Sequence, residues 1–146
     1  MADIVTLVAT LACVLFAGAA IYVNLVEHPA RLSCGTEIAA RQWAPSYRRA
    51  TVMRASLAVV AGVAGLVRWL QSGHAFWLWG AVGILAVVPV TLVVIFPTNK
   101  RLLESGRDLG SDETRALLVT WGRLHAIRSV LGLAASVLFI LATMHE

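Results

Sequence analysis

Charged side chains are scarce in this sequence. They make up 14% of its 146 residues, whereas soluble globular domains average about 25%. Hydrophobic residues make up 59% of the chain and lie in long blocks without a charge. So few charges cannot cover a water-facing surface, which argues against a soluble domain. We therefore interpret lipid as the solvent and predict a single-domain integral membrane protein.

Cysteine is nearly absent. The chain has only Cys13, inside the first apolar block, and Cys34, about twenty residues later in a predicted connection. This placement predicts no disulfide, and the spacing matches no zinc motif. We also expect no separate secretory signal, because the first apolar block is long enough to span a membrane and no small-residue cleavage site follows it.

Acidic residues are few, with 8 Asp and Glu against 12 Lys and Arg. A basic balance can indicate nucleic-acid binding. Here the cations flank apolar blocks, where such residues set membrane topology and contact anionic lipids. We therefore predict the lipid bilayer as a partner and no nucleic acid.

A helix crosses the hydrocarbon core with roughly 20 apolar residues. Four segments predict such spans, at residues 4–25, 46–70, 75–99 and 112–144. The second and fourth are uncharged only over residues 55–67 and 129–144, so their spans are expected to include Arg54, Arg68 and Arg128 near the interfaces. The four segments predict an all-α fold, a polytopic four-helix bundle with up-down topology. Residues 27–44 form the longest connection, which we expect to lie at the membrane interface with a short helix over residues 36–43.

Local signals predict where the helices end. The polar residues from Asn24 to Pro29 are expected to close the first span, and Pro97-Thr98-Asn99 the third. Pro89 lies inside the third span and predicts a kink. Ser111 followed by Thr114 is typical of the N-terminus of a helix, which places the start of the fourth span.

The arginines and lysines predict the topology. The first and third connections carry Arg31, Arg41, Arg48 and Arg49, and Lys100, Arg101, Arg107 and Arg115, respectively. The second connection has little beyond Arg68, and the termini have none. The positive-inside rule then predicts a cell-membrane protein with connections one and three in the cytoplasm and both termini outside.

Polar residues gather at the predicted cytoplasmic ends of all four helices. Trp121, His125 and Arg128 are spaced i, i+4, i+7 and share one helical face, as do Tyr47 and Arg54, seven residues apart. Ionisable residues at membrane depth are functional candidates. We expect these faces to enclose one cavity. The full set is Tyr22, Asn24, Glu27, His28, Trp43, Tyr47, Arg54, Thr98, Asn99, Trp121, His125 and Arg128.

Structural roles compete with these functional ones. Arg54 and Arg128 are long enough to reach lipid phosphates. His28, which precedes Pro29, is compatible with simple termination of the first helix, and Asn99 is compatible with a cap at the end of the third helix. Histidine within an apolar helix needs a polar partner, so a functional role is favoured for His125.

At these residues the chain resembles the anthrone oxygenase-like integral membrane proteins, a family long carried as a domain of unknown function. The resemblance rests on HPAR at residues 28–31, WAPSY at 43–47, Arg54, PTN at 97–99 and W-x3-H-x2-R at 121–128. It spans nearly the whole chain in the same order. Members with an assigned activity are mostly fungal enzymes that oxidise a polyketide anthrone to an anthraquinone with O2.

The resemblance implies a monooxygenase that oxidises a flat, hydrophobic aromatic molecule with O2, without a cofactor. His125 is the expected base, because imidazole titrates near neutrality, and His28 is second. Arg54 and Arg128 are expected to hold the oxyanion. The expected substrate contacts are a hydrogen bond from Asn99 and stacking on Trp43, Tyr47 and Trp121.

Two functions are alternatives to the oxygenase. His28 and His125, with Glu27 as a third ligand, are candidate ligands for haem or a single metal ion. The second alternative is a non-catalytic module that binds a lipid, a quinone or a partner subunit. Its small-residue surfaces would support helix pairing or a homo-oligomer, and they contain Gly62, Gly65, Gly80 and Gly83.

Overall fold

The computed structural model describes residues 4–145, and every regular element in this range is helical. Two pairs of α-helices are each joined without a break by a π-helical turn. The elements are α1 (Ile4–Tyr22), η1 (Val23–Glu27), α2 (His28–Ser33), α3 (Thr36–Ser72), α4 (Ala75–Val90), η2 (Thr91–Ile95), α5 (Phe96–Leu102) and α6 (Asp112–Met144).

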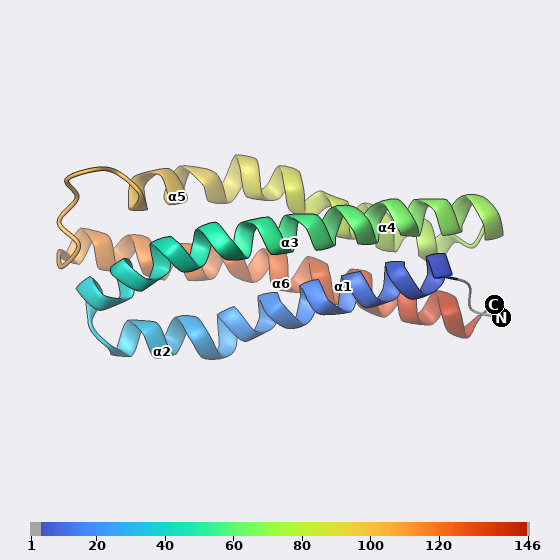
Figure 1. The fold of residues 1–146 in the computed structure, drawn as a ribbon, viewed down its shortest axis with the longest axis horizontal. Helices are drawn as coiled ribbons and strands as arrows, with labels where there is room; N and C mark the ends of the chain where they lie inside the picture. Colours follow the sequence, from blue (N-terminus) through green and yellow to red (C-terminus); the bar gives the residue numbers. More distant parts are fainter. Residues whose placement is uncertain (1–3, 146) are drawn as a thin grey trace.

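These elements form four long rods, which run antiparallel to one another along the chain (Figure 1). The α1 rod packs on α3 and α6, and the α4 rod packs on the same two helices, so the rods make a closed ring in chain order. The two ends of the described chain lie at the same end of the bundle as the α3–α4 turn. The predicted all-α four-helix bundle with up-down topology is confirmed.

Each rod is long and apolar enough to cross a membrane. The four candidate spans are Ile4–Ser33, Thr36–Ser72, Ala75–Leu102 and Asp112–Met144. All four exceed the length that the hydrocarbon core requires. The longest, α3, has 37 residues and therefore a length of about 55 Å.

The first and third helices continue past the prolines that were expected to close them. Proline lacks an N–H, and its ring meets the carbonyl four residues earlier. For Pro29 and Pro97 those carbonyls belong to Leu25 and Val93, which lie in η1 and η2. The wider π-helical turn gives room at these carbonyls, so the chain resumes an α-helix instead of stopping.

The expected interfacial connection over residues 27–44 is also corrected. The chain there is helical on both sides of a two-residue turn, Cys34-Gly35. Gly35 has φ 91°, a conformation that favours glycine. The expected helix from Thr36 forms, but it runs on through Pro45 to become the first part of α3.

The connection between α5 and α6 is held by ion pairs. Arg107 lies 2.9 Å from Glu104 and 3.3 Å from Glu113, and Arg101 lies 2.8 Å from Glu113. The hydroxyl of Ser111 accepts a hydrogen bond from the backbone N–H of Thr114 at 3.2 Å. The helix start predicted at this serine is confirmed.

Two apolar cores flank a polar layer along the bundle. In the core nearer the chain ends, glycines leave space for the large side chain of Phe139. A Cβ on Gly65 or Gly80 would lie 2.5 Å from the Phe139 ring. The second core, near the α2–α3 turn, contains Trp43 and Trp121. Between them lie the buried polar side chains of the candidate site.

Candidate functional site

Arg54 lies at the middle of α3, with its side chain only 1% exposed. Its Nε donates to the carbonyl of Ala50 one turn earlier, at 3.2 Å. Its Nη1 donates to Nε2 of His125 on α6. The packing of α3 beside the α1 and α6 rods therefore places this guanidinium in the interior, where it does not reach the lipid or water outside.

His125 is fully buried and is held on its other ring nitrogen by Asn24 of η1. Its Nδ1 lies 2.6 Å from Oδ1 of Asn24. The same oxygen accepts from the Ser129 hydroxyl at 2.6 Å, and Nδ2 of Asn24 donates to the Gly122 carbonyl at 2.9 Å. One hydrogen-bonded chain thus joins Asn24, His125 and Arg54 across three helical rods.

Arg128 is 4% exposed and has no hydrogen-bond acceptor among residues 4–145. It packs over the ring of Phe16, with 6.0 Å from Cζ to the ring centroid. Glu27, a partly exposed acid, pairs with Arg31. Within the described chain, no carboxylate pairs with Arg54 or Arg128. Buried charges in proteins are normally paired, so these two cations leave an excess of positive charge.

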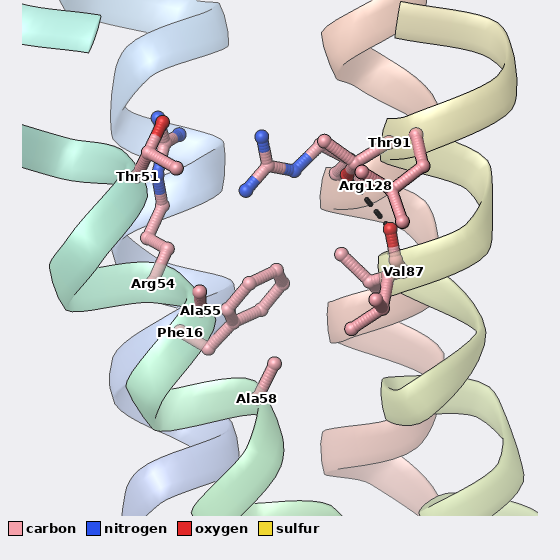
Figure 2. A pocket seen from close by; sticks show the side chains of 10 residues that line it. Phe16, Thr51, Arg54, Ala55, Ala58, Val87, Thr91 and Arg128 are labelled. Carbon is pink, nitrogen blue, oxygen red and sulfur yellow. Dashed lines mark hydrogen bonds between the residues drawn. The ribbon is translucent and has the colours of Figure 1, made fainter. Parts of the chain in front are cut away.

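Both arginines line a cavity of about 140 Å³ between α3 and the α4 rod. Figure 2 shows Arg54 along one wall of this space and the guanidinium of Arg128 reaching into it from the opposite wall. Ala55, Val88 and Leu92 at its edge are exposed, so the cavity opens sideways between the two rods. The remaining lining residues are Phe16, Thr51, Ala58, Val87 and Thr91.

The size and lining of the cavity limit what it holds. Apart from two threonines and the two arginines, its lining is hydrophobic. A dry cavity of about 150 Å³ holds one benzene ring, whereas sites for drug-sized ligands measure about 300–1,000 Å³. The enclosed part therefore fits one aromatic ring, and a larger ligand has to extend through the side opening.

The aromatic residues expected to stack on a substrate pack against each other instead. The rings of Trp43 and Tyr47 stack with centroids 5.0 Å apart, and Trp121 meets Trp43 edge-on at 5.7 Å. Asn99 donates from Nδ2 to the Tyr47 hydroxyl at 3.1 Å. These four side chains are absent from the cavity lining, and they support the wall behind the polar layer.

His28 also lies away from the cavity. Its Nε2 is 2.9 Å from the Leu118 carbonyl, and its Nδ1 is 3.4 Å from Nη1 of Arg31. Its ring packs on Trp121, with centroids 5.0 Å apart. Both ring nitrogens are therefore engaged, and the side chain joins α2 to α6.

The alternative metal ligands do not converge. Besides Arg31, the Glu27 carboxylate accepts from Ser46 at 3.0 Å and from Gln42 at 3.3 Å. His125 uses both ring nitrogens within its own chain of hydrogen bonds. In the part of the chain that the structure describes, no group of three His, Cys, Asp or Glu side chains is placed to hold a metal ion.

Sequence reasoning did not assign a site role to several residues of this layer. Asn24 was included in the polar set at the helix ends but received no specific role, although a single amide closing a charge-free block was a usable signal. Ser129, Phe16, Thr51 and Thr91 gave no signal, because in an apolar helix such residues look the same whether they face lipid or a cavity.

Comparison with known proteins identifies the family. The family model described as anthrone oxygenase matches residues 43–138. This range includes Arg54, Asn99, His125 and Arg128 but starts after Asn24. No solved structure matches the chain significantly.

Three curated proteins show the same relationship. The chain is similar to anthrone oxygenase nsrD of Aspergillus novofumigatus, with 33% identity over 115 residues, 73% of this chain and 71% of that protein. It is 30% identical over 148 residues to an anthrone oxygenase of Claviceps purpurea, covering 92% and 85%. It is 39% identical over 71 residues to anthrone oxygenase tpcL of Aspergillus fumigatus, covering 45% and 43%. The chain belongs to the anthrone oxygenase family.

Proposed function

We propose that this protein is a membrane-embedded oxygenase that oxidises a flat, anthrone-like aromatic molecule with O2 and without a cofactor. The observation that carries the proposal is Arg128, a buried cation without an acceptor, on the wall of a hydrophobic cavity beside a second cation, Arg54. The family relationship supports the oxygenase chemistry.

The two arginines suit a substrate that becomes an anion. An anthrone carries a CH2 group opposite a ketone, and loss of one CH2 proton spreads negative charge onto the ketone oxygen. Fixed cations in a low-dielectric site stabilise such developing charge strongly. Arg54 and Arg128 lie on opposite walls of the cavity (Figure 2), so the oxyanion is held between them.

The oxidation then needs only the substrate anion and O2. The anion gives one electron to O2, and the resulting carbon radical and superoxide combine into a C–O bond, which forms a peroxide. Uptake of one proton and loss of water convert this carbon into a second ketone. The CH2 group has lost two hydrogens and gained one oxygen atom, and the other oxygen atom of O2 leaves as water.

His125 is the proposed base. In the arrangement without substrate its Nε2 accepts a hydrogen bond from Arg54. When Arg54 turns to the substrate oxygen, this lone pair becomes free to take the CH2 proton. The same movement of the Arg54 guanidinium then binds the substrate oxygen and exposes the base.

The proposed substrate route runs through the membrane. A hydrophobic substrate partitions into lipid and enters between α3 and α4, past Val88 and Leu92. One ring occupies the enclosed space and the other rings lie along the opening. In this proposal the bundle sits in the cell membrane with the polar layer toward the cytoplasmic face and both chain ends outside, as arginine counting predicts.

The experiment supplies an anthrone and O2 to the purified protein in lipid nanodiscs, and follows O2 uptake and quinone absorbance. The expected result is one O2 consumed per quinone formed. Arg128→Met is expected to lower kcat/KM by about 10²–10³-fold, as loss of one oxyanion donor does. Arg123→Met, which removes an exposed arginine of the same helix, is the matched control and is expected to retain activity.

Two results would contradict the proposal. Equal turnover in Arg128→Met and Arg123→Met would remove the buried arginine from the chemistry. Saturable binding of the anthrone without O2 uptake would favour the non-catalytic binding module instead. Elemental analysis of the active preparation tests the metal alternative directly.

A further inference from the structure

The side-chain amide of Asn24 has a fixed orientation. The Gly122 carbonyl can only accept a hydrogen bond, so the amide group that lies 2.9 Å from it is the NH2. This leaves Oδ1 facing α6, where the Ser129 hydroxyl donates to it. The oxygen that His125 meets is therefore an acceptor with no freedom to turn away.

This acceptor determines which nitrogen of His125 carries the proton. A neutral imidazole has one N–H and one lone pair. Oδ1 of Asn24 lies 2.6 Å from Nδ1, so Nδ1 carries the proton and Nε2 has the lone pair. The lone pair faces Arg54, which lines the cavity, whereas His125 itself is not among the lining residues.

We propose that Asn24 is a positioning residue that keeps the reactive lone pair of His125 on Nε2 during catalysis. The inference rests on the proposed function. While Arg54 donates to Nε2, that contact alone excludes a proton there. Once Arg54 turns to the substrate, only the bond to Asn24 still holds the proton on Nδ1. Without it the proton moves to Nε2, and the base has no lone pair facing the substrate.

The fold explains why this role falls to α1 and η1. Asn24 is the second residue of η1, the π-helical turn that precedes Pro29, and such turns occur frequently at functional sites. The turn lies beside α6 and brings the amide within reach of Gly122, His125 and Ser129. Asn24 precedes the range matched by the family model, so this inference comes from the contacts alone.

The kinetic test compares two variants at the packing surface between the first rod and α6. Asn24→Leu removes the acceptor and keeps a side chain of similar size. Ser136→Ala removes a buried hydroxyl of the same surface that bonds to Gly132 and Cys13, and serves as the matched control. We expect Asn24→Leu to lower kcat about 10–100-fold, as loss of a group that orients a functional histidine does, with KM nearly unchanged. A folded Asn24→Leu protein with the kcat of Ser136→Ala would overturn the proposal.

The spectroscopic test needs no substrate. Arg54→Met removes the other group that holds the tautomer, so ¹⁵N spectra of labelled histidine in this variant report the influence of Asn24 alone. The His125 signals are identified by their loss in Arg54→Met/His125→Gln. We expect only the Nδ1–H form in Arg54→Met, and the Nε2–H form to appear when Asn24→Leu is added. An unchanged tautomer in the double variant would overturn the proposal.

The two tests separate failure of this inference from failure of the proposed function. If the wild-type protein does not oxidise anthrones, the proposed function fails, while the tautomer spectra still decide the role of Asn24. If the wild-type protein is active and Asn24→Leu is equally active, only the inference about Asn24 fails.

Discussion

In the proposed function, Arg128 serves substrate binding at the expense of stability. The Arg128 side chain is almost fully buried, and its Nε is shielded from solvent without an acceptor among residues 4–145. Replacing buried charged groups by hydrophobic residues of similar volume is often neutral or stabilising. Residues that are unfavourable for folding are expected where function requires them.

We therefore expect Arg128→Met to melt at a higher temperature than the wild-type protein while its turnover falls. A gain of about 1 kcal/mol in the free energy of unfolding corresponds to about 2–8 °C in a chain of this size range. Thermal unfolding of both proteins in the same detergent measures the shift. A marked drop in melting temperature would mean that Arg128 has a stabilising partner, contrary to the contacts described.

His125→Ala is expected to change stability in the opposite direction. It leaves Nη1 of Arg54 without its acceptor on α6, which costs about 1–3 kcal/mol for a buried group left unpaired, while Oδ1 of Asn24 keeps the Ser129 hydroxyl as its donor. We expect a lower melting temperature, a retained helical circular dichroism spectrum and no turnover. Unchanged turnover in this folded variant would remove His125 as the base.

At the scale of helices, contact distances are set by glycines. A Cβ on Gly122 would lie 2.7 Å from Cδ2 and 2.8 Å from Nε2 of His28, so the ring would have to move. A Cβ on Gly83 would meet only the Ala135 Cβ at 3.7 Å, an ordinary contact. The same substitution therefore tests close packing at one site and helix propensity at the other.

Gly122→Ala is expected to destabilise the bundle by about 1–3 kcal/mol through overpacking and to break the bond between His28 and the Leu118 carbonyl. Gly83→Ala is expected to leave stability unchanged or to raise it by up to about 1 kcal/mol, because alanine favours helix over glycine. Denaturation in mixed micelles compares the two. Equal stabilities would show that α2 and α6 are not in close contact at Gly122.

The sequence predicted the helices better than their ends. Four uninterrupted apolar blocks indicate four spans, because lipid leaves the backbone few other solutions. Pro29 and Pro97 were interpreted as stops, which is their usual effect. Whether a chain stops at a proline or widens into a π-helical turn depends on packing against neighbouring helices, as with Asn24 against α6, and a single sequence does not contain that information.

The site was predictable only in part for a similar reason. Helical spacing correctly places Trp121, His125 and Arg128 on one buried face of α6. It does not reveal that consecutive turns of this face meet different neighbours, an aromatic core at Trp121 and a cavity at Arg128. Which residues line a cavity follows from the tilt and depth of all four rods together.

At the scale of the whole molecule, the two natural cysteines provide a topology test. Cys34 is exposed at the α2–α3 turn, and Cys13 is buried in the core. If that turn is cytoplasmic, a membrane-impermeant maleimide should label wild-type protein in inside-out vesicles and not in right-side-out vesicles. Cys34→Ser should abolish labelling.

A cysteine at the opposite end of α3 supplies the control, because it should be labelled from the other side of the membrane. Ser72 is exposed at the opposite end of α3, and Ser72→Cys in the Cys34→Ser background should be labelled only in right-side-out vesicles. Labelling of wild-type Cys34 from the outer side would contradict the predicted topology and place the polar layer toward the outer leaflet.

The position of Arg54 along α3 has a consequence for ligand choice. Eighteen residues of α3 lie on each side of Arg54. Arg54 is therefore about 27 Å from Ser72, close to the thickness of about 30 Å of the hydrocarbon core. With Ser72 at the outer edge of that core, as the proposed topology has it, the cavity would lie where acyl chains give way to glycerol. Fused-ring phenols and ketones concentrate at that depth, with rings among the chains and oxygens toward the headgroups. The bilayer would thus select and pre-orient ligands before the protein touches them.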